Sequence, residues 1–200
     1  MATSRKAKAK PAVRYSLRIE LAEITPVIWR RVWVEGHIRL VQLHHIIQAA
    51  MGWSDAHLHA FKIGDTRYGT PDPEDDPDYP LIDERTVRLD QILIPDLRFE
   101  YQYDFGDNWV HLVRVELAKA LDQPYGAAHV EAGAGACPPE DCGGSFGYQK
   151  FLDQFAADPD DDEVESFFEW AGEDFNPHQF DRHAANAALL RMAWNQWGEK

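Results

Sequence analysis

The sequence is poor in cysteine and in long apolar runs, and each shortage excludes a class of protein. Two cysteines in 200 residues cannot build a disulfide framework, so a reducing compartment is expected. No apolar run approaches the roughly 20 residues that a membrane-spanning helix needs. The N-terminus also lacks the apolar stretch of a signal peptide. We therefore expect a cytoplasmic protein that does not associate with membranes.

Basic residues are also scarce relative to acidic ones, and this disfavours anionic partners. The formal net charge is −14, which repels a phosphate backbone. The exception is the start of the chain, where Arg5, Lys6, Lys8 and Lys10 precede Pro11. We expect residues 1–12 to form a disordered basic tail. Nucleic acid is not expected as a partner except through this tail.

Several catalytic signatures are missing as well. The sequence has no phosphate-binding Gly-Lys-Ser/Thr loop, no dinucleotide fingerprint, no nucleophile elbow and no His-Glu-x-x-His pair. It also has no internal repeat and no linker that would separate two domains. Residues 13–200 are therefore predicted to form a single domain.

What the sequence does contain is typical of a globular α+β protein. Apolar residues make up 44% of the chain and there are seven tryptophans. Alternating or apolar runs predict strands at 13–21, 27–34, 57–63, 99–105 and 109–117. Helical spacing predicts a helix at 40–51 that ends at Gly52. The order of elements indicates a mostly antiparallel sheet with one N-terminal helix packed on it.

The C-terminal part is predicted to be a helical segment. Apolar spacing marks one helix around Tyr148 and another around Val164. Asn176, Pro177 and Gln179 have the spacing of an N-cap, a first-turn proline and its N3 partner. They predict that the last helix begins there. Residues 71–80 and 123–147 are predicted to be loops, acidic and glycine-rich respectively.

The first candidate site is the tip of the predicted hairpin. If Gly106 and Asp107 form a two-residue loop, Asp104 faces Trp109, and His111 lies on the same face of the sheet. An Asp beside a His can orient and charge the imidazole, as a general base or a metal ligand requires. The alternative is that the tip residues serve only the turn.

The second candidate is the segment 137–144, with the sequence CPPEDCGG. Glu140 and Asp141 are adjacent, so in extended backbone they point in opposite directions. A zinc site on the two cysteines, Cys137 and Cys142, would have to recruit a histidine such as His129 or His111. A disulfide is a further alternative, but plain buried thiols are favoured over both.

The third candidate is the pair His57 and His59. On a strand these side chains would share a face with Phe61, and two histidines at this spacing can chelate one metal ion. The favoured interpretation is that both are partly buried and bonded to backbone or carboxylate partners.

A series of motifs in one order resembles a known family. The motifs are PVIWRR at 26–31, Leu43-His44, QAAMGW at 48–53, His57-Leu58-His59 with Phe61, Tyr103 to His111, PPEDCGG at 138–144 and Gly147-Tyr148. Together they resemble the plasmid pRiA4b ORF-3-like family, also labelled insertion-element passenger proteins, from about residue 13 to the final helix. The resemblance implies an α+β fold and an association with plasmids or mobile elements, but no settled activity. Some members carry a further upstream cysteine, which this chain lacks, although His129 is nearby.

Two hypotheses for function follow. The leading one is a small binding or interaction module with a polar groove lined by Asp104, Asp107, Trp109 and His111, and closed by the loop that carries Glu140 and Asp141. Its ligand or protein partner is not specified by the sequence. The alternative is a metal-dependent hydrolase, with nucleic acid as one candidate substrate. Its divalent metal ligands would come from His57, His59, Asp104, Asp107 and His111.

Overall fold

The computed structural model describes residues 12–72, 80–121, 126, 128–172 and 174–197. The predicted basic tail lies outside these residues except for Ala12, as does most of the predicted acidic loop at 71–80. Among the described helices, none combines the length and the apolar character that crossing a membrane requires.

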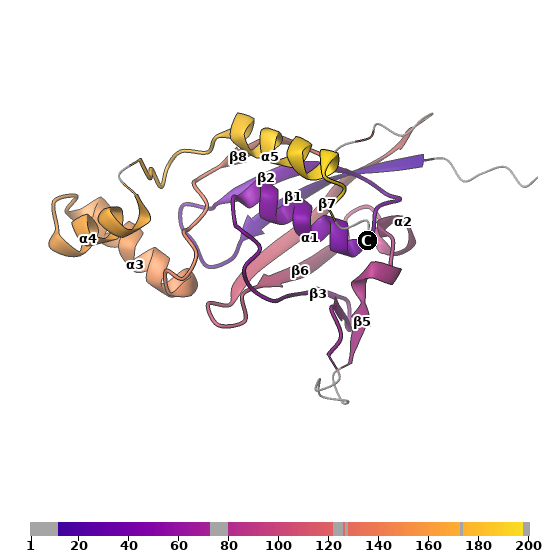
Figure 1. Cartoon of the computed structure of the whole chain (residues 1–200), viewed down its shortest axis with the longest axis horizontal. Coiled ribbons are helices and arrows are strands. Elements are labelled where there is room, and N and C mark those ends of the chain that lie inside the picture. The colour runs from indigo at the N-terminus through magenta and orange to yellow at the C-terminus, as the bar shows by residue number, and fades with distance from the viewer. Residues whose placement is uncertain (1–11, 73–79, 122–125, 127, 173, 198–200) are drawn as a thin grey trace, which may run out of the picture.

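The fold is an eight-stranded sheet with helices on one face and at one end, so the α+β prediction is confirmed (Figure 1). The strands are β1 (Ala12–Leu21), β2 (Trp29–Glu35), β3 (His59–Ile63), β4 (Thr66–Gly69), β5 (Leu81–Asp83), β6 (Arg98–Tyr103), β7 (Trp109–Leu121) and β8 (His129–Ala134). They are ordered β5-β4-β3-β6-β7-β1-β2-β8. Only the β4–β5 pairing is parallel, so the sheet is mostly antiparallel, as expected.

The helices divide into two groups. They are α1 (Leu40–Met51), α2 (Leu89–Ile92), α3 (Gly144–Ala157), α4 (Asp162–Ala171) and α5 (Arg182–Trp194), with a 3-10 turn, η1 (Glu84–Thr86), before α2. Helices α1 and α5 lie side by side over one face of the sheet, whereas α3 and α4 project beyond its end (Figure 1).

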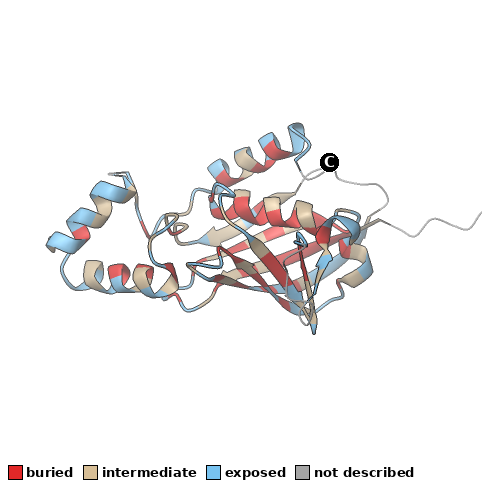
Figure 2. Ribbon diagram, turned by 60° about the horizontal axis from the view of Figure 1, so that its bottom comes forward, coloured by how far each residue is buried: buried red, intermediate tan, exposed pale blue. Residues whose placement is uncertain are grey.

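Helix α1 has the predicted bounds because its apolar stripe faces the sheet. Leu40, Leu43 and Ile47 recur at helical spacing and are completely buried. Gly52 ends the helix in the left-handed conformation, with φ of 117°, that glycine tolerates best. The core therefore lies between α1 and the inner face of the sheet, where Figure 2 shows the buried residues concentrated.

The predicted start of the last helix at Asn176 is wrong. Asn176 does accept a hydrogen bond from the His178 amide, but the chain makes only one turn there. Helix α5 begins after Asp181, whose side chain accepts bonds from the His183 and Ala184 amides at 2.8 and 2.9 Å. The buried apolar positions of α5 all lie after this cap.

We expect Asp181→Ala to lower the free energy of unfolding by about 1 kcal/mol, because two amides at the start of α5 lose their acceptor. Denaturant unfolding of the two proteins measures this loss. The matched control is Asn176→Ala, which removes one turn bond and is expected to have a smaller effect. A larger loss for Asn176→Ala would contradict the assignment of the cap.

Candidate metal centre

The hairpin between β6 and β7 is longer at its tip than the sequence suggested. Its loop runs from Asp104 to Asn108, and Tyr103 pairs with Trp109 while Tyr101 pairs with His111. The predicted two-residue loop, with Asp104 facing Trp109, is therefore wrong. Asp104 and Asn108 both have positive φ, 53° and 55°, and Asp and Asn tolerate this conformation better than other non-glycine residues.

Because of this register, Trp109 and His111 point into the core. Both side chains are completely buried, and the edge of the Trp53 ring packs against His111 with ring centroids 5.1 Å apart. The Nδ1 atom of His111 lies 3.2 Å from the Tyr101 carbonyl oxygen. Burial lowers the pKa of His111 to about 4. Neither residue is placed to line an open groove.

Asp104 instead joins His57 and Asp141, and these three residues are called the His57 cluster below. The imidazole Nε2 of His57 lies 3.7 Å from Asp104 Oδ2 and 3.5 Å from Asp141 Oδ1. One ligand atom from each residue lies within 4.8 Å of the other two. The hairpin tip and the loop at 140–144 therefore meet around His57, which was not among the residues expected to line the groove.

Glu140 lies beside the cluster and is held in place by three donors. Its Oε1 atom accepts hydrogen bonds from the Ser54 amide at 3.0 Å, the Ser54 hydroxyl at 3.1 Å and the Tyr103 hydroxyl at 3.0 Å. The other oxygen, Oε2, is buried and has no hydrogen bond within the part of the chain described. It lies 3.9 Å from His57 Nε2. Glu140 and Asp141 thus each place one carboxylate oxygen near His57 Nε2, at 3.9 and 3.5 Å.

Glycines allow the two loops to approach this closely. A Cβ on Gly144 would lie 2.3 Å from the Asp107 carbonyl oxygen, and φ at Gly144 is 67°. A side chain at this position would push the start of α3 away from the hairpin tip. Asp107 itself contributes its backbone to this contact and is not part of the His57 cluster.

The chemistry of the His57 cluster suits a divalent cation. One imidazole and two carboxylates are ligands that zinc accepts, and carboxylate oxygens also suit manganese. Ligand atoms that share a zinc ion lie about 2.0–2.2 Å from it, so a small inward movement of Asp141 would complete the geometry. The Asp141 side chain is 73% exposed, whereas that of Asp104 is 10% exposed. The cluster is therefore firmly anchored on one side and open to solvent on the other.

His59 and His111 do not join this centre. His57 precedes β3, so the two histidines do not share a strand face as predicted. Both carboxylate oxygens of the buried Glu84 lie within hydrogen-bonding distance of His59 Nε2, at 2.9 and 3.1 Å. The composite site of His57, His59, Asp104 and His111 is thus replaced by a smaller one.

A second cluster was not predicted from the sequence and is built around His44. This buried side chain has Nδ1 2.8 Å from the Tyr101 hydroxyl and Nε2 2.6 Å from Asp55 Oδ1. Its ring stacks on that of His59 with centroids 3.4 Å apart. Burial alone would raise the pKa of Asp55, but hydrogen bonds from His44 and His45 outweigh it and hold that pKa below its usual range. Ligand atoms of His44, His45 and Asp55 also lie within 4.8 Å of one another, close enough to share an ion. Because short hydrogen bonds already satisfy His44 and Asp55, we interpret the cluster as structural.

The two cysteines are free thiols. Burial raises the pKa of Cys142 to about 12, and burial also raises that of Cys137. With no metal bound, neither thiol is therefore ionised at neutral pH, as a thiolate nucleophile would be. Neither belongs to a potential metal-binding group within the described residues.

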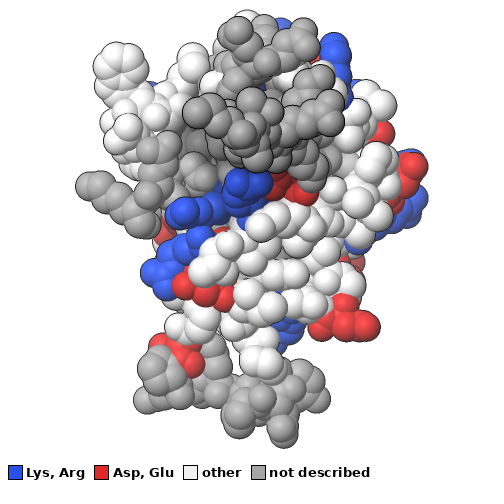
Figure 3. Space-filling model, turned by 90° about the vertical axis from the view of Figure 1, so that its right-hand side faces the viewer, with Lys and Arg blue, Asp and Glu red and all other residues white. Residues whose placement is uncertain are grey.

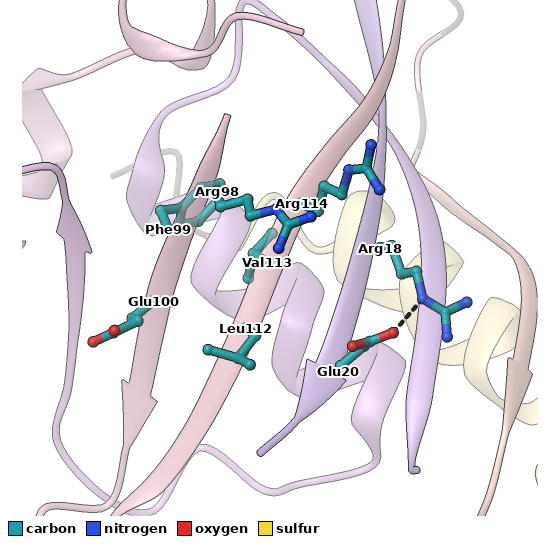
Figure 4. A pocket seen from close by; sticks show the side chains of 8 residues that line it. All are labelled: Arg18, Glu20, Arg98, Phe99, Glu100, Leu112, Val113 and Arg114. Carbon is teal, nitrogen blue, oxygen red and sulfur yellow. Dashed lines mark hydrogen bonds and ion pairs between the residues drawn. The ribbon is translucent and has the colours of Figure 1, made fainter. Parts of the chain in front are cut away.

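The open face of the sheet holds a shallow pocket of about 320 Å³ (Figure 4). Arginine and glutamate side chains from β1, β6 and β7 surround it, and Arg18 forms an ion pair with Glu20. Arg114 is paired with Asp96 at 2.9 Å. Charges of both signs also lie next to one another on the side of the molecule seen in Figure 3. The pocket in Figure 4 is therefore surrounded by paired, solvent-exposed charges, and its described lining residues lack the buried polar groups of a reactive site.

Comparison with known proteins places the chain among relatives without an assigned activity. The family model described as "Plasmid pRiA4b ORF-3-like protein" matches residues 13–184. An uncharacterized protein, y4hQ, from Sinorhizobium fredii is 38% identical over 178 residues, which is 88% of each chain. The crystal structure of a protein of unknown function, MM3350, from Methanosarcina mazei Go1 superposes with a TM-score of 0.76 at 33% identity. That match covers 87% of this chain and 98% of the other.

Proposed function

Since the chain belongs to the plasmid pRiA4b ORF-3-like family, whose description names no reaction, we propose its function from the geometry: it is a small binding module centred on one divalent metal ion. The observation that carries the proposal is the His57 cluster. Its imidazole faces two carboxylates at 3.5 and 3.7 Å. This geometry leaves space for an ion shared among the three groups.

The surroundings of the cluster support this proposal. Asp104 is fixed, because its Oδ1 accepts a hydrogen bond from the Gly106 amide at 2.9 Å and leaves Oδ2 facing His57. Asp141 is exposed, so the outer side of the ion would be open to a ligand that supplies further donor atoms. A carboxylate or phosphate group of the partner would fill such positions.

The test is metal content. Protein purified without chelator and then loaded with Mn²⁺ or Zn²⁺ is expected to retain one ion per chain after gel filtration, and treatment with EDTA is expected to remove it. Elemental analysis measures the ratio. A ratio near zero for both metals would sink the proposal, since one anchored carboxylate, one imidazole and a second carboxylate within reach should hold at least one of them at micromolar concentration.

A second candidate, metal-dependent hydrolysis, is favoured by one specific observation. Glu140 lies beside the cluster with a buried oxygen that has no hydrogen bond within the described residues. A base in this position would take the proton from a water molecule as its oxygen attacks the phosphorus of a phosphodiester. The new bond joins phosphorus to the water oxygen, the bond to the leaving oxygen breaks, and solvent protonates that leaving oxygen. Burial raises the pKa of Tyr103, so this residue remains a hydroxyl donor to Glu140.

We expect Glu140→Gln to retain the metal ion and to lower the rate of hydrolysis by about 100-fold or more. The substrates are bis(p-nitrophenyl) phosphate and a single-stranded DNA oligonucleotide, each with Mn²⁺-loaded protein. Glu169→Gln, an exposed change on α4, is the matched control and should leave the rate unchanged. If the unmutated protein cleaves neither substrate, or if Glu140→Gln cleaves as fast, the hydrolytic candidate is excluded and the binding module is unaffected.

A further inference from the structure

Arg30 is a buried cation whose charge has no carboxylate partner in the described part of the chain. Its side chain is 1% exposed. Its Nε donates to the Ala50 carbonyl at 3.0 Å, and Nη1 donates to the carbonyls of Trp29 and Ala134 at 2.8 and 3.0 Å. These bonds connect β2 to the end of α1 and the end of β8. They leave Nη2 without a hydrogen bond to any described residue.

The surroundings of Arg30 do not neutralise it. The Phe180 ring covers the guanidinium, with Cζ 3.8 Å from the ring centroid. Burial lowers the pKa of Arg30 to about 10, which still leaves it charged at neutral pH. The nearby Cys137 stays a neutral thiol, because burial raises its pKa. Carbonyl dipoles at the end of α1 offset part of the charge, but a buried charge is normally also paired with an opposite one.

A cavity of about 480 Å³ lies against this guanidinium, between α1, α5 and the chain before α5. Figure 1 shows these two helices side by side on the same face of the sheet. The lining is mainly apolar and built from small side chains, including Ala49, Ala184 and Ala188, with Phe175 at one wall. The volume falls within the range of small-molecule sites, which are about 300–1,000 Å³.

The charged groups at the cavity favour an anion. Besides Arg30, the lining includes Arg191 and Asp181. The Asp181 carboxylate is already engaged, because it accepts the two amide bonds that begin α5. Two cations and one committed carboxylate therefore line the space, together with Gln179 and mainly apolar side chains.

We propose that this cavity binds a small apolar carboxylic acid. Its carboxylate accepts a hydrogen bond from Arg30 Nη2, and its hydrocarbon part lies along the alanines of α1 and α5. This pairing supplies the counter-charge that the fold does not provide, and the Phe180 ring over the guanidinium limits the access of water to the ion pair. The site is separate from the His57 cluster and does not depend on its function.

The test compares three probes of equal chain length: octanoate, octanol and octylammonium. Titration calorimetry on the full chain is expected to show octanoate binding at least tenfold tighter than octanol, with no binding of octylammonium. The emission of Trp53, which also lines the cavity, should change on the same titration. Ala188→Trp keeps Arg30 but fills the cavity, and is expected to abolish octanoate binding.

Arg30→Gln, if it folds, is expected to bind octanoate at least tenfold more weakly. The control is Arg85→Gln, which replaces an exposed arginine and should bind octanoate as the unmutated protein does. Two outcomes would overturn the proposal. Equal affinity for octanoate and octanol would show that the charge is not used. Unchanged octanoate binding in Ala188→Trp would show that the ligand lies elsewhere, and Arg30 would then serve only to connect the three carbonyls.

Discussion

Asp104→Asn is expected to lower the affinity for Mn²⁺ by at least about 100-fold, because it removes the anchored anionic ligand of the proposed centre. The substitution is suited to the question. Asn tolerates the positive φ of 53° at this position, and its side-chain oxygen can still accept the Gly106 amide. The hairpin tip should therefore keep its shape, and only the charge facing His57 changes. Titration calorimetry, with Mn²⁺ added to the metal-free protein, measures the affinity.

The matched control is Asp107→Asn in the same loop. Asp107 carries the same charge three residues further on, but it does not belong to the His57 cluster, so its substitution should leave Mn²⁺ affinity within a few-fold. Equal losses in the two variants would mean that only the net charge of the loop attracts the ion. Retention of full affinity in Asp104→Asn would remove the carboxylate from the proposed centre.

His111→Phe is expected to flatten the dependence of stability on pH between about 7 and 4. Burial lowers the pKa of His111 to about 4, from an ordinary value of 6.5. Below pH 6.5 the unfolded chain therefore binds a proton that the folded chain does not, and stability falls as the pH is lowered towards 4. Through this shift, His111 contributes about 3 kcal/mol to the free energy of unfolding at pH 7, and most of that contribution is lost by pH 4.

Denaturant unfolding at several pH values measures this effect. At neutral pH, His111→Phe should lose about 1 kcal/mol, because the Tyr101 carbonyl loses a donor. Between pH 7 and 4 it should lose about 3 kcal/mol less than the unmutated protein does. A smaller slope from other histidines will remain, because burial also lowers the pKa of His44 and that of His129. His183→Phe, at an exposed position, is the control, and an unchanged slope in His111→Phe would contradict the account.

Local patterns were sufficient for the elements whose buried faces recur in sequence. The spacing of Leu40, Leu43 and Ile47 predicted α1 with its bounds, since a buried helix face repeats every three or four residues. The same spacing puts His44, four residues after Leu40, on the buried side of the helix, where the structure has it. Strand β8 was missed because it has one strongly apolar residue, Val130, and forms by pairing with β2 far away in the sequence.

The start of α5 shows where a local signal misleads. Asn176 and Pro177 have the residue types of a helix start, and they do form a turn. The helix itself depends on apolar contacts made by Ala185, Leu189 and Met192, which are buried. These contacts are set by the packing of α5 on α1, and this tertiary arrangement overrides the earlier cap.

For the candidate centre, the sequence predicted the residues better than their grouping. The predicted metal set contained His57 and Asp104, but it grouped them with His59 and His111, whereas Asp141 was expected only in the groove. The wrong grouping comes from the hairpin loop, whose length sets which residues of the two strands are paired. A shift of one residue in that pairing moves each side chain to the opposite face of the sheet. The approach of the loop at 140–144 depends on glycine at 144, and no spacing rule predicts a contact between segments so far apart in the chain.

The most direct test of the metal centre is diffraction from crystals grown with Mn²⁺, with data collected near the manganese absorption edge. The proposed function predicts one strong anomalous peak about 2.0–2.3 Å from His57 Nε2, Asp104 Oδ2 and a carboxylate oxygen of Asp141. A peak between His44, His45 and Asp55 instead, or no peak near the hairpin tip at full Mn²⁺ loading, would contradict it.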